Sequence, residues 1–316
     1  MKSKDSISDQ ALHIHHLLKA HRELLEDGVR NRAFYEALQK RVTRNSVVLD
    51  VGSGTGIWAI TAALIGARKV VAIERDPMLI RLIKNLAREN RVQDKIEIIA
   101  GDSRQITLSR EFNLFISETI GNSAFEEEIV PILIDAKNRF LKRNADLIPR
   151  TVSLIAAPAY LKSESKKLPL GVPLSCDYFN SLSMNLPLLL RDKSRLRLVG
   201  ERRELLRVDL RTVKKPPVLS NLTARWKVNN TSGINCFVTW AEATLTEGVE
   251  LSTLNTTSWT PLAYMIKPFG GSSGELTFTL EASGKSNFWS SSLSKGRTEE
   301  RQSYSPVLAF ASLNAP

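Results

Sequence analysis

Residues 46–77, SVVLDVGSGTGIWAITAALIGARKVVAIERDP, carry the clearest pattern of secondary structure in the chain. The stretch opens with a short apolar run that ends at Asp50, and a glycine-rich turn follows at residues 52–56. An apolar segment long enough for a helix comes next, and a second apolar run then ends in Glu74. Short apolar runs separated by a turn and a helix are typical of parallel strands joined by a crossover. The stretch therefore predicts a strand–turn–helix–strand unit of an α/β fold.

The residues after the two predicted strands indicate what this unit binds. Gly52 and Gly54 have no Cβ, so the backbone of the turn can approach a ligand closely. Glu74 follows Gly54 by about 20 residues, a spacing at which an acid binds the hydroxyls of a ribose. We therefore expect a nucleoside cofactor. A nicotinamide dinucleotide is the less favoured alternative, because the full fingerprint G-x-G-x-x-G is not met.

The acidic strand end at Asp50, followed by GSGTG, resembles motif I of the class I S-adenosylmethionine methyltransferases. The resemblance implies S-adenosyl-L-methionine as the cofactor, with its amino-acid part over the turn at Gly52 and Gly54. It also implies that Glu74 holds the ribose, and it places Asp50 in the same cofactor-binding motif.

A third apolar run begins at Lys95 and ends in Gly101-Asp102-Ser103. In methyltransferases of this class, an acid or a nearby polar group at this place often meets the adenine amine. The resemblance therefore makes Asp102 and Ser103 candidates for cofactor binding. A simple turn formed by Gly-Asp is the alternative interpretation of the same residues.

The fourth apolar run leads into SETIGNSAFEEE, residues 117–128, which brings two acids back towards one place. Methyl transfer from a sulfonium is an in-line displacement, so an enzyme supplies mainly position and electrostatics. A guanidinium is a poor nucleophile because its lone pairs are delocalised. Two facing carboxylates could bind its fork and concentrate the positive charge on the far nitrogens. Glu118 and Glu127 could form such a pair if the loop doubles back.

The same segment resembles the double-glutamate loop of the protein arginine methyltransferases. The resemblance implies Glu118 and Glu127 as the catalytic pair. The alternative interpretation of the three glutamates is that they complement a helix N-terminus, and we expect this of Glu126 and Glu128. Upstream, HRELLEDGVRNRAFYEAL, residues 21–38, is similar to the helix that closes over the cofactor in this family. By position, Arg30 would bind the methionyl carboxylate, and His21 would lie beside the cofactor.

From Thr151 onward the pattern of apolar and polar residues changes. Runs of β-branched and aromatic residues, such as CFVTWAEATL from Cys236, alternate with clusters of Ser, Asn, Gly and Pro. Such short strands predict a barrel or sandwich, and they resemble the C-terminal β-barrel of the family. The predicted fold is thus α/β, with a Rossmann-like class I methyltransferase domain followed by a β-barrel domain. CDYFNSLSMN, residues 176–185, resembles the family's dimerisation arm and suggests a homodimer.

These resemblances predict three parts of the chain. Residues 1–45 form a helical segment that covers the cofactor, and residues 46–150 form the Rossmann-like domain that binds it. Residues 151–316 form the β-barrel domain for substrate and dimerisation.

The sequence also departs from the family pattern. Family members usually carry Thr-His-Trp in the barrel, whereas this chain has Thr257-Ser258-Trp259. Ser cannot accept a proton near neutral pH as His can, so either that histidine is dispensable or the proton leaves by another route. Trp259 is a candidate for the catalytic site as a wall beside the substrate, and a barrel-core aromatic is the alternative.

The N-terminal tyrosines of eukaryotic members are missing as well. ALHIHHLLKAH, residues 11–21, stands in that region and holds all four histidines of the chain. No acidic residue or cysteine lies in this stretch, so we predict no metal site. His15 is a candidate replacement for a lid tyrosine. In the double-glutamate loop, Thr119 and Ile120 stand where the family has Met and Trp, which reshapes the pocket.

Composition limits the classes of protein. The chain has 316 residues, two cysteines and a formal net charge of +11. The cysteines make neither a disulfide framework nor a metal-ligand set, and the first residues lack the apolar segment of a signal peptide. No apolar run reaches transmembrane length, so we expect a cytoplasmic protein that does not enter a membrane. The basic charge leaves contact with nucleic acid open.

Together these features predict an S-adenosylmethionine-dependent N-methyltransferase of the arginine methyltransferase type. Its acceptor would be the guanidino group of arginine in a protein, in a peptide or as the free amino acid. One alternative is a class I methyltransferase that acts on another amine or on RNA. The other is a degenerate family member that serves as a dimeric interaction scaffold.

Overall fold

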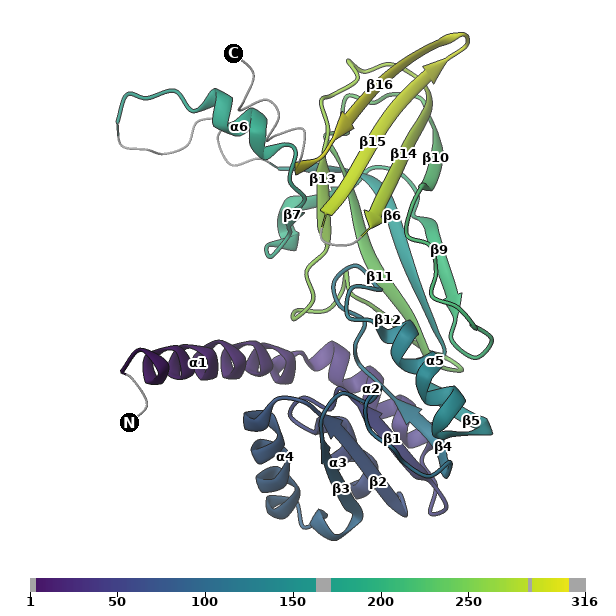
Figure 1. Cartoon of the computed structure of the whole chain (residues 1–316). Coiled ribbons are helices and arrows are strands. Elements are labelled where there is room, and N and C mark those ends of the chain that lie inside the picture. Colours follow the sequence, from purple (N-terminus) through teal and green to yellow (C-terminus); the bar gives the residue numbers. More distant parts are fainter. Residues whose placement is uncertain (1–3, 163–171, 284–285, 307–316) are drawn as a thin grey trace. The chain divides into compact units, whose positions relative to one another are not determined.

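The computed structural model describes residues 4–162, 172–283 and 286–306 (Figure 1). The chain divides into two compact units, and neither is one continuous stretch. Unit 1 comprises Met1–Val152, Val208–Pro216 and Glu242–Trp259. Unit 2 comprises Ser153–Arg207, Pro217–Ala241 and Thr260–Pro316.

Unit 1 is built on a five-stranded sheet in the order β3-β2-β1-β4-β5, in which neighbouring strands run parallel. Every residue of the middle strand β1 is buried. A strand covered on both faces needs a nearly continuous apolar run, which is the pattern that predicted it. The strands are β1 (Val47–Val51), β2 (Lys69–Glu74), β3 (Ile96–Ala100), β4 (Phe112–Ile116) and β5 (Leu141–Ile148).

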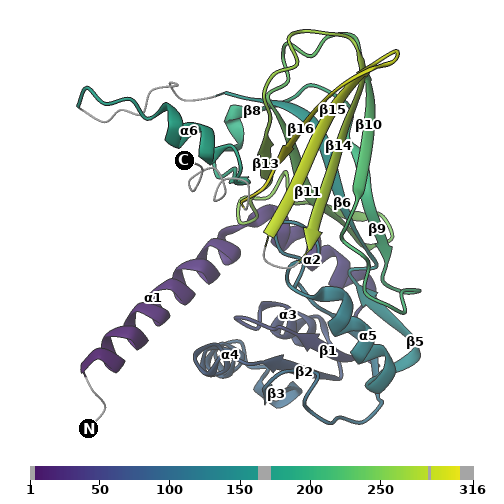
Figure 2. The ribbon, with the colours of Figure 1, turned by 45° about the horizontal axis from the view of Figure 1, so that its top comes forward.

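Helices surround this sheet. Figure 2 shows α3 and α4 beside β1, β2 and β3. The crossover from β1 is α3, which ends at Ile65 and has Gly66 as its C-cap. The helices of unit 1 are α1 (Lys4–Glu26), α2 (Gly28–Arg41), α3 (Ile57–Ile65), α4 (Pro77–Glu89) and α5 (Ile129–Arg139), with a 3₁₀ turn at Gln93–Lys95.

The predicted helix over residues 21–38 is broken at Asp27, between α1 and α2. Asp27 has a non-helical backbone, with φ −76° and ψ 86°, and its side chain accepts a hydrogen bond from Arg30 N. An aspartate in this position caps the helix that follows it. The chain can therefore change direction at Asp27 and begin a second helix.

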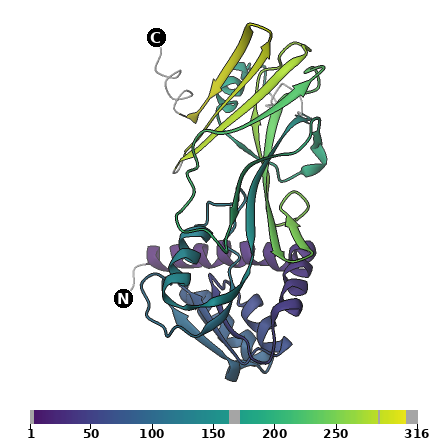
Figure 3. The ribbon, with the colours of Figure 1, turned by 90° about the vertical axis from the view of Figure 1, so that its right-hand side faces the viewer.

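Unit 2 is antiparallel. One sheet has the strand order β7-β13-β11-β6-β8, with β9 also paired to β6, and the other has the order β10-β14-β15-β16. Figure 3 shows the last strands in yellow as long, antiparallel neighbours. The strands are β6 (Thr151–Leu161), β7 (Leu188–Leu189), β8 (Leu196–Leu198), β9 (Arg203–Asp209), β10 (Leu222–Val228), β11 (Cys236–Thr246), β13 (Leu262–Met265), β14 (Gly274–Ser283), β15 (Ser286–Lys295) and β16 (Thr298–Tyr304).

Short elements complete the chain. A helix, α6 (Asp177–Ser183), and a 3₁₀ turn, Lys193–Arg195, lie in unit 2. The strand β12 (Val249–Ser252) pairs with the end of β11 in unit 1. Within the described ranges, the pairings of unit 2 make two sheets and do not close a barrel. No helix among the described residues is long and apolar enough to cross a membrane.

Candidate active site

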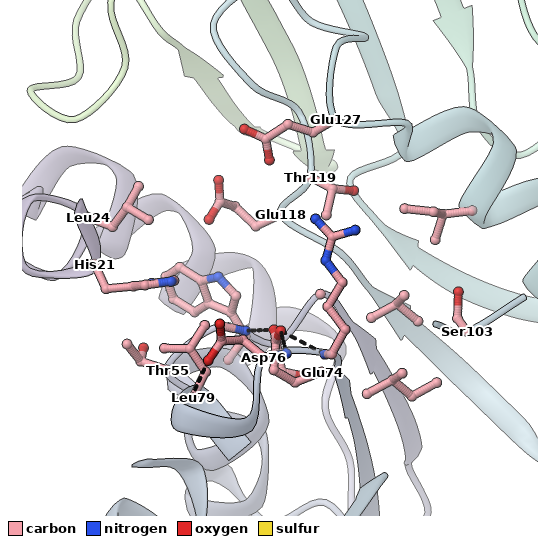
Figure 4. A pocket seen from close by; sticks show the side chains of 18 of the residues that line it. His21, Leu24, Thr55, Glu74, Asp76, Leu79, Ser103, Glu118, Thr119 and Glu127 are labelled. Carbon is pink, nitrogen blue, oxygen red and sulfur yellow. Dashed lines mark hydrogen bonds between the residues drawn. The ribbon is translucent and has the colours of Figure 1, made fainter. Parts of the chain in front are cut away.

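A cavity of about 630 Å³ lies in unit 1, where the loops after β1, β2, β3 and β4 meet. The carboxyl ends of neighbouring parallel strands share one edge of the sheet, and ligands of open α/β sheets bind there. The predicted site residues are thereby brought together (Figure 4). Those that line the cavity are His21, Arg30, Gly52, Gly54, Glu74, Asp102, Ser103, Glu118, Glu127 and Trp259; Asp50 does not line it.

The glycine-rich turn forms a tight cradle in the cavity wall. Gly52, Gly54 and Gly56 have φ values of +72°, +56° and +79°, a region that L residues with a Cβ rarely adopt. A Cβ on Gly52 would lie 2.8 Å from the Thr119 side chain, and a Cβ on Gly54 would lie 3.0 Å from His21. The turn thus excludes side chains both by conformation and by space.

Glu74 organises the segment after β2. Its carboxylate accepts hydrogen bonds from Gly54 N at 2.8 Å, Arg75 N at 2.8 Å and Asp76 N at 2.9 Å (Figure 4). The side chain is therefore fixed at the cavity, on the glycine turn. A carboxylate can accept about four hydrogen bonds, so capacity remains for a hydroxyl donor of a ligand.

Asp50 lies at the end of β1 and is fully buried. Within the described residues, neither carboxylate oxygen has a partner at full hydrogen-bond geometry, although the Ser53 side chain and the Ala59 N–H lie near enough to oppose the effect of burial on the pKa. Burial raises the pKa of Asp50 to about 7. Buried polar atoms without partners are rare in folded proteins and point to a functional demand.

Asp102 is held by its neighbour Arg104. Its carboxylate accepts bonds from the backbone and from the guanidinium of Arg104, with Nη2 at 2.8 Å. These bonds lower the pKa of Asp102 to about 2. The residue therefore has the turn geometry of the alternative interpretation, and it also lines the cavity. Ser103 is buried beside it.

One face of α1 lines the cavity through His13, Leu17, His21 and Leu24. His13 Nε2 lies 3.0 Å from Asp76 Oδ2, and Asp76 is the N-cap of α4. Burial lowers the pKa of His21, and the positive charge of Arg30 acts in the same direction. His15, the candidate replacement for a tyrosine, does not line the cavity.

Arg30 and Glu118 meet in the cavity. Arg30 Nη1 donates to Glu118 Oε2 at 2.8 Å, and Arg30 Nη2 donates to Leu24 O at 2.8 Å. The guanidinium lies 5.5 Å from the ring centre of Trp58 and 6.0 Å from that of Trp259. Burial raises the pKa of Glu118 to about 8, although Arg30 acts in the opposite direction.

Glu127 lies on the same side of the cavity as Glu118 (Figure 4). Its carboxylate has no hydrogen-bond partner within the described part of the chain, and the exposed part of the side chain faces the cavity. The surrounding protein still limits its hydration, which raises the pKa of Glu127 to about 7, with a smaller contribution from the charge of Glu126. The 117–128 loop therefore doubles back as predicted.

Glu126 has a different role from the predicted one. Its carboxylate accepts a hydrogen bond from Asn122 N at 2.5 Å and another from Ser123 Oγ, so it closes the loop on itself. α5 begins only at Ile129, and Glu128 at its N-cap makes no capping bond. Glu128 therefore lies where an acid complements the N-terminus of α5, as expected, whereas Glu126 is used within the loop.

Asp27 does not line the cavity but contacts residues beside it, and the sequence does not predict this role. Its carboxylate accepts bonds from Arg30 N, Thr257 N, Ser258 N and Ser258 Oγ. The aspartate before Gly28 could have been read as a helix cap. Its hydrogen bonds to residues 257 and 258, however, join segments far apart in the chain, so no pattern of neighbouring residues predicts them. Unpredicted lining residues include His13, Leu17, Leu24, Thr55, Trp58, Asp76, Leu79 and Ile132.

Comparison with known proteins agrees with this geometry. The family model described as Ribosomal protein L11 methyltransferase (PrmA) matches residues 33–148. Protein arginine N-methyltransferase PRMT10 of Oryza sativa subsp. japonica is 37% identical over 139 residues, 43% of this chain and 36% of the relative. Protein arginine N-methyltransferase 6 of Danio rerio is 30% identical over 156 residues, 49% of this chain and 42% of the relative. The alignments thus span less than half of these relatives.

Solved structures match over much more of the chain. The Trypanosoma brucei PRMT1 enzyme-prozyme heterotetrameric complex with AdoHcy has a TM-score of 0.76 at 20% identity, covering 90% of this chain and 97% of that one. Protein arginine methyltransferase 10 of Arabidopsis thaliana has a TM-score of 0.75 at 19% identity, covering 90% and 97%. These likenesses confirm the predicted fold class.

The sheet order, the glycine cradle and the acid at the end of β2 define a class I methyltransferase domain. With the antiparallel unit added to this domain, the chain is similar to protein arginine N-methyltransferases in both sequence and fold. The recognition made from the sequence is confirmed. The roles of the individual site residues stay predictions.

Proposed function

We propose that this protein transfers a methyl group from S-adenosyl-L-methionine to a guanidino nitrogen of arginine. The observation that carries the proposal is the pair Glu118 and Glu127, two carboxylates on one side of a cavity that the glycine cradle also lines. One of them, Glu118, already binds a guanidinium, that of Arg30. The names of the relatives support the same chemistry.

The residues of the cavity fit the cofactor. Gly52 and Gly54 leave backbone exposed where a Cβ would collide with neighbouring side chains. Glu74 keeps acceptor capacity for the ribose hydroxyls. Asp50 lies at the end of β1, before the turn, and does not itself line the cavity. Arg30 would hold the methionyl carboxylate, and His21, Asp102 and Ser103 would contact the nucleoside part. When bound, the cofactor supplies an electrophilic methyl group. AdoHcy in the Trypanosoma brucei complex supports this assignment.

The two glutamates would bind and orient the acceptor. A guanidinium presents N–H groups in a planar fork, and each carboxylate can accept two of them. Both glutamates must be ionised to do so, and an arriving cation stabilises their ionised forms. The positive charge would be concentrated on the bound nitrogens, which are those far from the methyl group, and this leaves the third nitrogen more nucleophilic. As its new N–C bond forms, that nitrogen loses one N–H proton.

Glu127 is the residue best able to take that proton. Its carboxylate makes no other hydrogen bond in the described residues, whereas Glu118 is paired with Arg30. A carboxylate whose pKa lies near 7 both accepts and releases a proton easily at neutral pH. Trp259 would form one wall beside the acceptor. Its side chain is buried and also faces Arg30.

We also propose that the protein works as a homodimer through the segment around α6. Tyr178 and Phe179 on this helix expose 58% and 61% of their surface. Large exposed apolar side chains that lie together often mark an interface. The Trypanosoma brucei neighbour is described as a heterotetrameric complex. The predicted division at residues 45 and 150 and the cytoplasmic location also stay proposals.

A methyl-transfer assay tests the proposed function. The protein is incubated with radiolabelled cofactor and three acceptor pools: an arginine-rich protein, short arginine peptides and free arginine. Products are hydrolysed and identified as methylated amino acids. Methylarginine from the native protein, and none from Glu127→Gln, is the expected result. Cofactor binding without methylarginine in any pool would remove the guanidino assignment and leave another amine or RNA as the acceptor.

A further inference from the structure

The strongest unassigned feature of unit 1 is a set of hydrogen bonds on one buried carboxylate. Asp27 Oδ2 accepts from Thr257 N at 2.9 Å, from Ser258 N at 2.9 Å and from Ser258 Oγ at 2.6 Å. Asp27 Oδ1 accepts from Arg30 N at 3.0 Å. Asp27 itself has no exposed surface. Both oxygens of this carboxylate therefore accept hydrogen bonds, and they join the start of α2 to the segment at 257–259. We call these four hydrogen bonds of Asp27 the clasp.

We propose that Asp27 is a positioning residue that fixes two walls of the cavity at once, Arg30 and Trp259. The ligand of that cavity is taken from the proposed function, on which this inference rests. Arg30 is three residues beyond Asp27 in the first turn of α2, and Trp259 follows directly after the two residues that donate to Asp27. A shift of Asp27 would therefore move both side chains.

The position of the two walls relative to each other matters for binding. The Arg30 guanidinium faces the rings of Trp58 and Trp259, and a cation near an aromatic face is stabilised by the ring. Trp58 belongs to α3, and its ring stacks on Phe34 of α2 with centroids 4.6 Å apart. Packing of α2 against α3 thus places Trp58 beside Arg30. The clasp at Asp27 holds the segment that carries Trp259, whose ring centre lies 6.0 Å from the same guanidinium.

The clasp also explains the serine that replaces the histidine of the family pattern. The Ser258 hydroxyl donates its single proton to Asp27 Oδ2, and the backbone N–H of the same residue donates to the same oxygen. Burial alone would raise the pKa of Asp27, but the bonds from Ser258, Arg30 and Thr257 outweigh it and lower that pKa. Asp27 therefore stays ionised and fully occupied. Neither residue is placed to take a proton from the acceptor.

Two variants test the clasp with readouts that do not need methyl transfer. Asp27→Asn keeps the shape, but its amide nitrogen cannot accept the three donors. Ser258→Ala removes only one of them. The control is Asp192→Asn in unit 2, because Asp192 also accepts from a serine backbone N–H and hydroxyl, those of Ser194, in an exposed turn. S-adenosylhomocysteine is titrated calorimetrically into each protein, and the emission of Trp259 is isolated by subtracting that of Trp259→Phe.

We expect Asp27→Asn to bind S-adenosylhomocysteine at least about tenfold more weakly, because hydrogen bonds to a buried charge are strong ones. Its Trp259 emission should shift to longer wavelength as the indole becomes more hydrated. Ser258→Ala should show the same changes at about threefold, and Asp192→Asn should show neither. If Asp27→Asn keeps both the native affinity and the native emission, the clasp does not position these walls.

The outcomes separate this inference from the proposed function. A native protein that fails to bind S-adenosylhomocysteine contradicts the cofactor assignment, while the emission of Trp259 still tests the clasp. If Asp27→Asn does not fold, Ser258→Ala decides by the same two measurements. An unchanged emission and affinity in Ser258→Ala would then overturn the proposal.

Discussion

Arg30 and Glu118 form a buried ion pair, with Arg30 Nη1 2.8 Å from Glu118 Oε2 and only 2% and 13% of the two side chains exposed. The carboxylate assigned to the acceptor thus already binds a guanidinium, and the arginine assigned to the cofactor already binds a carboxylate. A ligand that takes either member releases the other. Binding of cofactor and acceptor should therefore be energetically coupled, and such coupling is reciprocal.

The coupling can be measured directly. An arginine-containing peptide should bind at least about fivefold more tightly when S-adenosylhomocysteine is present, because the product's carboxylate engages Arg30 and frees Glu118. Calorimetric titration of the peptide with and without S-adenosylhomocysteine gives the coupling. In Glu118→Gln the difference should disappear, since no ion pair remains to be exchanged. If the native protein binds the peptide equally well with and without S-adenosylhomocysteine, the two ligands do not separate Arg30 from Glu118.

Glu127→Gln should retain cofactor binding and lose most methyl transfer, by about 100-fold, because it removes charge from the clamp without changing its shape. The thermal midpoint should not fall, since Glu127 has no hydrogen bond to lose within the described residues. The rate of methyl transfer with saturating peptide checks the predicted loss of activity. Calorimetric titration with S-adenosylhomocysteine checks that cofactor binding is retained. Glu111→Gln, which removes one surface carboxylate paired with Lys69, is the matched control and should keep the native rate. If Glu127→Gln transfers methyl groups at the rate of the native protein, the clamp hypothesis is wrong.

Gly54→Ala should abolish cofactor binding. Its φ of +56° is unfavourable for alanine by about 1 kcal/mol, and the new Cβ would also lie 3.0 Å from the His21 side chain. Gly296→Ala separates the two causes, because Gly296 has φ +60° and nothing within 4 Å of an added Cβ. Both variants should lose similar stability in thermal unfolding. Only Gly54→Ala should lose calorimetric binding of S-adenosylhomocysteine.

The pH profile of kcat/KM should rise through neutrality. Burial raises the pKa of Glu118 to about 8 and that of Glu127 to about 7, and only ionised glutamates bind a guanidinium. The rate should therefore increase between about pH 6 and 8 and level off above the higher pKa. A profile that is flat over this range would contradict the assignment.

Stability should have the opposite pH dependence. Between the ordinary glutamate pKa and the raised values, the folded state holds protons that the unfolded state has lost, so the free energy of unfolding falls as pH rises across that window. Denaturant unfolding of the native protein and of Glu127→Gln, compared from pH 5 to 8, should show a smaller fall in the variant.

The sequence predicts the parallel half of the fold well because its strands, turns and helices each correspond to a pattern of neighbouring residues. β2 is the predicted run Lys69–Glu74, and α3 ends before Gly66 as its glycine indicates. The site residues at the strand ends come together for a topological reason: parallel strands end at one edge. The positions of Glu74, Asp102 and Glu118 around one cavity follow from that rule.

What the sequence does not predict depends on contacts between distant segments. The bond between Asp27 and Ser258 joins residues 231 positions apart, and no periodicity records it. The pairing of Arg30 with Glu118 needs both α2 and the loop after β4 in place. The histidines that line the cavity are His13 and His21, because the position of α1 decides which of its faces is covered.

The interrupted course of unit 1 has a consequence for biosynthesis. Lys137 Nζ donates to the carbonyl oxygens of Leu210, Arg211 and Val213, and Arg150 N donates to Thr244 O. These partners, like those of Asp27, emerge from the ribosome only after much of unit 2 has been made. During synthesis, α5 and the segment after β5 therefore lack these partners until residues 210–259 have been made. We expect the last contacts of unit 1 to form only after the first part of unit 2 has left the ribosome.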